Sequence, residues 1–290
     1  MRKLKWENEY NHRKDIYSRR HVVKSISEYL SSLSYPGRTI LIGNLSDGTQ
    51  VIAYALMGRS SNSQNRILAF EEGRITTKLF RKEVAGDTKW TLYDAILFSN
   101  GKWVIANGDH SIEIAKALKE GKDLGEAIIK LSPEEDTYST PRISAILDPE
   151  SSEYSLSIVR KNNDKNEKII WKYKPFNGFG RIIHTYTGDG SAKSFIGDPV
   201  TVKLPDFDLF NDIWSSLNPE NRISLFVSAG DDTQIANRHR TIERNRLLDR
   251  PLERKNWREF GPETSNRKLM NQQRTVSSKL NKIQVGKIEE

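Results

Sequence analysis

The sequence predicts an α+β protein whose sheets are largely antiparallel. Asp47-Gly48 and Asn100-Gly101 are strong hairpin-turn signals, and each lies between two short apolar runs. Other strand-like runs follow one another directly, and the helices that the pattern predicts come in pairs. A regular alternation of strand and helix, which would indicate a parallel sheet, is missing from the sequence. We therefore expect antiparallel sheets with a few helices packed on them.

The first predicted element is an amphipathic helix over residues 21–33, after a polar and charged stretch that we expect to pack poorly. Its apolar side chains recur at helical spacing and predict a helix that docks on the body of the protein. They are Val22, Val23, Ile26, Tyr29, Leu30 and Leu33.

The body that follows alternates between hairpins and helix pairs. The predicted strands cover residues 39–43, 50–56, 92–98, 103–106, 143–147, 154–160, 168–173, 181–186, 199–204 and 222–228. The predicted helices cover residues 110–120, 124–131 and 209–217. Beyond residue 230 the sequence becomes basic and loses any sustained apolar period, which is typical of an arm that is partly helical or disordered.

Charge divides the chain at the same places. Residues 1–34 carry a net charge of +4 and residues 231–290 a net charge of +5. Residues 35–230 carry a net charge of −1, and the whole chain has a net charge of +8. We therefore expect three parts: a basic N-terminal extension (1–34), a nearly neutral body (35–230) and a basic C-terminal tail (231–290). The basic ends could contact nucleic acid or a protein partner, but interleaved acidic residues dilute the field of the tail. Nucleic-acid binding is not the favoured function.

Composition excludes several functional classes. The chain of 290 residues has no cysteine, so disulfides, thiolate catalysis and iron–sulfur clusters are excluded. Its apolar runs are much shorter than the roughly 20 residues of a membrane-spanning helix. The N-terminus lacks the apolar segment of a secretory signal. We expect a cytoplasmic protein without membrane contact, and the sequence leaves open whether it forms a homo-oligomer.

The polar segment from Met57 to Arg66 is the most informative stretch. It brings two arginines, two asparagines and a glutamine together directly after a predicted strand. Guanidinium and amide groups offer planar donors that suit phosphate and carboxamide groups. A solvated hairpin tip would have a similar composition.

Several motifs together resemble the archaeal-type IMP cyclohydrolases, in the order in which that family has them. They are Tyr35-Pro36-Gly37-Arg38, the segment 57–66, Ala106-Asn107-Gly108-Asp109-His110, Thr140-Pro141-Arg142-Ile143-Ser144, and Gly180-Arg181 with His184-Thr185-Tyr186-Thr187-Gly188-Asp189-Gly190. The resemblance covers residues 35 to about 230. It implies a four-layer αββα sandwich like that of the N-terminal-nucleophile hydrolases.

The resemblance also implies a reaction, the closure of the purine ring in the last step of IMP synthesis. A carboxamide nitrogen on an imidazole ribotide attacks a neighbouring formamido carbon, and water leaves. The enzyme must select the reactive rotamer, stabilise an oxyanion and move protons. We expect a purine nucleotide as the substrate, and no metal or cofactor, since this chemistry requires none.

The resemblance assigns roles to residues of the first two motifs. Arg59 and Arg66 would face the 5′-phosphate or the oxyanion, although one of them could simply form an ion pair. Asn62 and Asn65 would read the carboxamide and formamide groups. Arg38 belongs to the expected substrate-binding set.

The remaining expected site residues follow in sequence order. Tyr93 would donate to the oxyanion, or it is an ordinary strand aromatic. Asn107 and Asp109 would bind substrate at a helix N-terminus, where Asp109 could instead be an N-cap. His110, which ordinarily titrates near neutrality, is the best general acid–base candidate among the histidines.

Three more expectations concern the later motifs. Arg142 would contact substrate or form a structural ion pair. Tyr186 and Asp189 would bind ribose or phosphate, although Gly-Asp-Gly is also a common tight turn. His184 is as compatible with a packed core as with the site, and His12, His21 and His239 are expected to be solvated. An N-terminal-nucleophile amidohydrolase is disfavoured, since the chain has no cysteine and no evident processing site.

Overall fold

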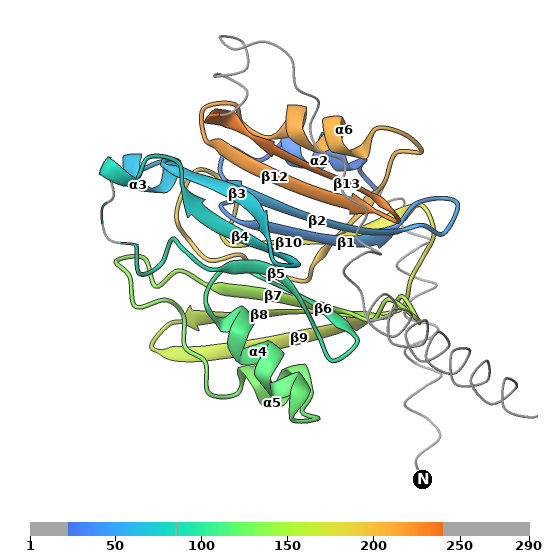
Figure 1. Ribbon diagram of the computed structural model, residues 1–290, viewed down its shortest axis with the longest axis horizontal. Coiled ribbons are helices and arrows are strands. Elements are labelled where there is room, and N and C mark those ends of the chain that lie inside the picture. Colours follow the sequence, from blue (N-terminus) through green and yellow to red (C-terminus); the bar gives the residue numbers. More distant parts are fainter. Residues whose placement is uncertain (1–22, 85, 87, 240–290) are drawn as a thin grey trace, which may run out of the picture.

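The computed structural model describes residues 23–84, 86 and 88–239, which form two antiparallel sheets (Figure 1). The first sheet has the order β11 (Val200–Lys203), β10 (Phe179–His184), β1 (Thr39–Asn44), β2 (Gln50–Met57), β12 (Arg222–Ala229) and β13 (Asp232–Asn237). The second has the order β3 (Arg66–Glu71), β4 (Arg74–Leu79), β5 (Asp94–Ser99), β6 (Lys102–Ala106), β7 (Arg142–Leu147), β8 (Tyr154–Asn162) and β9 (Lys165–Tyr173). The predicted α+β class with mainly antiparallel sheets is confirmed.

Short helices cover the two sheets on opposite sides of the molecule (Figure 1). Helices α2 (Ile26–Ser31) and α6 (Leu209–Ser216) pack on the first sheet. Helices α4 (His110–Lys119) and α5 (Leu124–Ile128) pack on the second sheet. The short helix α3 (Ser61–Gln64) and a 3-10 turn, η1 (Lys82–Val84), lie in connections.

Three apolar cores hold these layers together. The first lies between the two sheets and includes Tyr54, Ile143 and Phe226, all at most 1% exposed. The second joins α2 and α6 to the first sheet, and the third joins α4 and α5 to the second sheet. Strands β1 and β2 face a core on each side, which explains their continuous apolar sequence.

The predicted hairpins are confirmed, and three strands were missed. Strands β1 and β2 pair around Asp47-Gly48, and β5 and β6 pair around Asn100-Gly101. The missed pair β3–β4 turns at Glu72-Gly73, where both residues have positive φ. Because glycine adopts positive φ readily, this dipeptide was a usable turn signal.

Elements from both predicted appendages belong to the folded unit. Helix α2 is shorter than predicted, beginning at Ile26 after a capping box on Ser25, but Ile26 and Leu30 dock in the second core as expected. Strand β13 falls within the predicted tail, yet it pairs with β12 along its whole length. The tail beyond residue 239, for which nucleic-acid contact was the less favoured alternative, lies outside the described residues. So do residues 1–20, which were expected to pack poorly, and His21.

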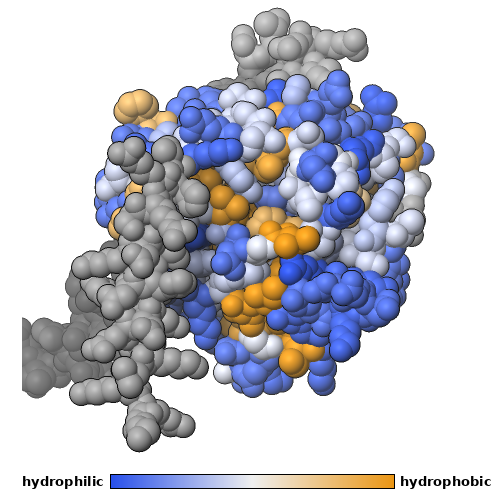
Figure 2. Space-filling model, turned by 180° about the vertical axis from the view of Figure 1, so that it is seen from behind, coloured by the Kyte–Doolittle hydropathy of each residue, from blue (hydrophilic) through white to orange (hydrophobic). Residues whose placement is uncertain are grey.

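The surface is mainly polar, with apolar side chains interspersed. Figure 2 shows such side chains on the face opposite to that of Figure 1. The most exposed large ones include Phe176, Ile196 and Phe207, which come from separate connections. In the part of the chain that the structure describes, no helix combines the length and apolar character needed to cross a membrane.

Candidate active site

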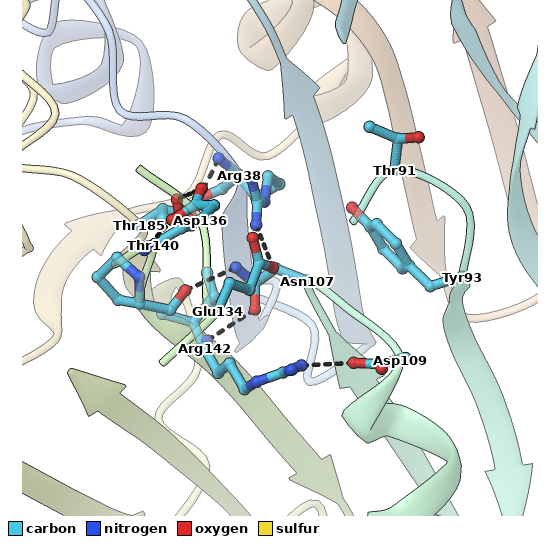
Figure 3. A network of polar contacts seen from close by, with 12 residues as sticks. Arg38, Thr91, Tyr93, Asn107, Asp109, Glu134, Asp136, Thr140, Arg142 and Thr185 are labelled. Carbon is cyan, nitrogen blue, oxygen red and sulfur yellow. Dashed lines mark hydrogen bonds and ion pairs between the residues drawn. The ribbon is translucent and has the colours of Figure 1, made fainter. Parts of the chain in front are cut away.

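A buried ion pair lies at the centre of the polar groups between the sheets. Arg38, just before β1, donates from Nη2 to Oε1 of Glu134 at 2.7 Å, and Glu134 is 2% exposed (Figure 3). Burial raises the pKa of the Glu134 carboxyl, although Arg38 opposes this effect. The Nε of Arg38 is buried and has no hydrogen-bond partner among the described residues. A buried charged donor left in this state is costly, so it suggests a ligand group at this point.

The motif Tyr35-Pro36-Gly37-Arg38 explains how Arg38 enters this space. Gly37 has a φ of +75°, and a Cβ there would lie 2.8 Å from the Tyr186 ring, so only glycine fits. The backbone of Arg38 then pairs with Thr185, whose N–H donates to the Arg38 carbonyl at 2.9 Å. These contacts fix the start of β1 against the end of β10.

Arg66 is a second buried guanidinium, 2% exposed, at the start of β3. Its Nε donates to the Ser63 carbonyl at 2.8 Å. No carboxylate lies within ion-pair distance of Arg66 in the described part of the chain. Burial lowers the pKa of Arg66, and the electrostatic neighbours that shift it include Tyr93, Arg38 and Tyr54. Since buried charges are normally paired, Arg66 suits an anionic ligand.

Two tyrosines lie beside these arginines. The hydroxyls of Tyr54 and Tyr93 are 2.8 Å apart, and both side chains are buried. Burial raises the pKa of Tyr54 well above its ordinary value, so its hydroxyl is a hydrogen-bond donor rather than a base. The expected role of Tyr93 beside the reacting groups stays a prediction.

Arg142, at the start of β7, is tied to the N-terminus of α4. It donates to Oδ1 of Asp109 at 2.5 Å, to Nδ1 of His110 at 3.1 Å and to the Ser132 carbonyl at 2.9 Å. Asp109 occupies the N-cap position of α4, but its side chain makes no capping bond there. Asp109 instead serves as the carboxylate partner of Arg142.

The expectation that His110 titrates near neutrality is wrong. Burial, followed by the charge of Arg142, lowers the pKa of His110 to about 3. Because Nδ1 accepts from Arg142, the neutral ring carries its proton on Nε2, which faces the Ile143 carbonyl at 3.3 Å. His110 thus positions Arg142, and its ring stays neutral at neutral pH rather than taking up a second proton.

Two of the asparagines that were expected to bind the substrate bond to backbone groups instead. Asn107 donates to the Pro141 carbonyl and accepts from the Ile143 N–H, both at 2.8 Å. Asn65 bonds both backbone groups of Arg81, at 2.7 and 2.8 Å. Asn62 lies against Gly86. In this structure, Asn107 and Asn65 brace the chain around the arginines.

Arg59 and the loop after β10 form the rim of the site. The Arg59 guanidinium lies 4.2 Å from the ring centroid of Tyr35 and donates to the Gly190 carbonyl at 2.6 Å. Tyr35 in turn stacks on Tyr186, whose hydroxyl bonds Thr140. The Asp189 carboxylate accepts from Thr187 and Ser191, and these bonds lower its pKa to about 2. Asp189 therefore holds the turn closed, and Arg59 is exposed.

Two histidines have structural contacts. His184 is 1% exposed, and its Nδ1 donates to the Tyr186 carbonyl while its Nε2 accepts from the Tyr29 hydroxyl at 2.7 Å. The packed-core interpretation of His184 therefore applies, and burial lowers its pKa to about 4. His239, expected to be solvated, instead stacks on Phe80 with a centroid distance of 4.3 Å.

The buried neutral histidines predict a loss of stability in mild acid. The pKa of His110 is about 3 and that of His184 about 4, whereas both are near 6.5 in the unfolded chain. Their contribution to stability is complete above pH 6.5 and falls as the pH drops, by up to ~1.4 kcal/mol per pH unit for each histidine. Urea denaturation at pH 7, 6 and 5 measures this slope. His184→Gln should remove about one proton from it, and an unchanged slope would contradict the assignment.

Glu134, Tyr54 and Tyr35 were not predicted as site residues. Glu134 lies in the acidic run Glu134-Glu135-Asp136, which three residues separate from the Thr-Pro-Arg motif. That proximity was the available signal, but only the fold shows that Glu134 turns inward while Glu135 is exposed.

Comparisons with known proteins identify relatives of this chain. A family model described as IMP cyclohydrolase-like protein matches residues 35–234. An IMP cyclohydrolase of Methanopyrus kandleri is 30% identical over 157 residues, which cover 52% of this chain and 75% of the relative. One of Methanocaldococcus jannaschii is 30% identical over 156 residues, with 52% and 73% covered. One of Halobacterium salinarum is 29% identical over 130 residues, with 43% of this chain and 63% of that relative covered.

Proposed function

The chain belongs to the IMP cyclohydrolase-like family, and we propose that it closes the purine ring of a formamidoimidazole-carboxamide ribotide to give IMP and water. The observation that supports this activity most strongly is the buried Arg38–Glu134 pair, in which a carboxylate of raised pKa adjoins a charged donor with an unused N–H. Ring closure needs a group that moves protons and a cation that stabilises an oxyanion.

The two groups divide the reaction between them. The carboxamide nitrogen forms a bond to the formyl carbon, and its proton passes by way of Glu134 to the formyl oxygen. Arg38 stabilises the negative charge that develops on this oxygen. The carbon–oxygen bond then breaks as the nitrogen that carried the formyl group gives up its proton, and the departing hydroxide takes this proton and leaves as water. The nucleophile is already tethered, so correct orientation provides most of the rate increase, and the reaction as written needs no cofactor.

The surrounding residues have complementary roles in this proposal. Arg66 binds the 5′-phosphate, since it is buried without a carboxylate partner among the described residues. Tyr93, next to Tyr54, donates to the oxyanion. Arg142 and Tyr186 border the substrate, and Arg59 lies over Tyr35 at the rim.

The arrangement of the sheets and helices also fits the family. We propose that the two sheets and their flanking helices correspond to the four-layer αββα sandwich of the N-terminal-nucleophile hydrolases. The catalytic unit would be the 35–230 body, completed by α2 and β13. A biosynthetic role of this kind fits a cytoplasmic protein.

A direct assay tests this function. Purified protein is incubated with the formamido nucleotide in the presence of a metal chelator, and IMP is followed by chromatography. We expect IMP to form much faster than in the absence of protein. Binding of IMP without any ring closure would contradict the proposal and leave a nucleotide-binding relative.

A further inference from the structure

A short segment at the end of β13 runs along the outer edge of β3. Asn237 lies at the edge of the first sheet and is 5% exposed. Its Oδ1 accepts from the Leu68 N–H at 2.8 Å, and its Nδ2 donates to the Leu68 carbonyl at 3.0 Å. One side chain therefore satisfies both backbone groups of an edge residue and joins the edges of the two sheets.

His239 makes a second contact along the same edge. Its Nε2 donates to the Gln64 carbonyl at 2.5 Å, and its ring stacks on Phe80 at an interplanar angle of 8°. We refer to residues 237–239 as the edge clip. The clip holds the chain at Gln64 and at Leu68, two positions that lie on either side of Arg66.

We propose that the edge clip positions Arg66 for the phosphate of the substrate. The Arg66 guanidinium is buried, and among the described residues it makes one hydrogen bond, to the Ser63 carbonyl within its own connection. The orientation of the guanidinium therefore depends on how firmly the backbone is held on both sides of Arg66. The clip lies beyond residue 234, where the family match ends, so this chain supplies it from its C-terminal extension.

The inference rests on the proposed function only through the phosphate that Arg66 binds. A shift of about 1 Å in a positioned group can cost about 100-fold in rate or binding. His239 is only partly buried, so its loss should leave the fold intact. We expect His239→Ala to weaken IMP binding about tenfold. Inosine binding should not change, because inosine lacks the phosphate.

Three substitutions of His239 separate bonding from packing. His239→Ala removes both contacts, His239→Phe keeps the stacking on Phe80 and removes the donor, and His239→Gln keeps a donor. Only His239→Gln should recover part of the IMP affinity. Gln234→Ala, on the same strand, is the matched control and should behave as the wild type.

Calorimetric titration of the full chain with IMP and with inosine tests the clip. The expected result is a fall in IMP affinity alone for His239→Ala and His239→Phe, with kcat for ring closure within about twofold of the wild type. Unchanged affinities, or equal losses for IMP and inosine, would overturn the role of the clip. If the wild type itself binds IMP and inosine equally, the phosphate assignment fails instead, which is a failure of the proposed function.

Discussion

Glu134→Gln lowers kcat for ring closure by about 1000-fold, because an amide cannot accept and return a proton. The glutamine keeps the size of the side chain and an oxygen that can accept from Arg38, so the site should stay folded. We therefore expect the dissociation constant of IMP to change by less than about threefold, a split that indicates loss of the chemical step. Steady-state kinetics and calorimetric titration measure the two quantities.

The neighbouring residue is the control for this substitution. Glu135 has the same chemistry but points to solvent, so Glu135→Gln should leave kcat unchanged. A Glu134→Gln variant that kept a tenth or more of the wild-type kcat would rule out proton transfer by Glu134. Arg38 would then act without this carboxylate as a catalytic partner.

Arg66→Gln weakens IMP binding by about 100-fold, which corresponds to about 2.7 kcal/mol. Charge-assisted bonds to phosphate are stronger than those of a neutral amide, and the burial of Arg66 enhances the difference. Thermal stability should not fall, because the substitution removes a buried charge that has no carboxylate partner in the described part of the chain. Titration with IMP and a thermal melt measure these effects.

Arg74, which is 40% exposed at its side chain and paired with Asp94 and Glu72, is the control. Arg74→Gln should change neither IMP binding nor the melting temperature by much. If Arg66→Gln lost inosine affinity as strongly as IMP affinity, the phosphate would not be its partner.

Local sequence signals predicted most elements of the body. The Asp-Gly and Asn-Gly turns, the helix α4 and the apolar runs of β1 and β2 depend on residues that are adjacent in the chain. The missed strand β13 has only short apolar content and is held by pairing with β12. Such pairing depends on the whole sheet rather than on local preference.

The sequence indicated which arginines and which tyrosine lie together in the candidate site. It gave less information on the role of each residue. Arg38, Arg66 and Tyr93 do lie together between the sheets. The sequence could not show that the side-chain amides of Asn65 and Asn107 form hydrogen bonds with backbone groups, or that burial keeps His110 neutral. It also missed Glu134, because an acidic run normally faces water and only the tertiary fold buries this one.

A crystal structure with IMP bound would show whether Glu134 and Arg38 lie at the reacting atoms. We expect the N1–C2 edge of the purine, where the ring closes, to lie within hydrogen-bonding distance of Glu134 and Arg38. We also expect the phosphate to contact Arg66. A phosphate bound at the Arg38–Glu134 pair, with the N1–C2 edge facing away from both residues, would rule out ring closure by this pair.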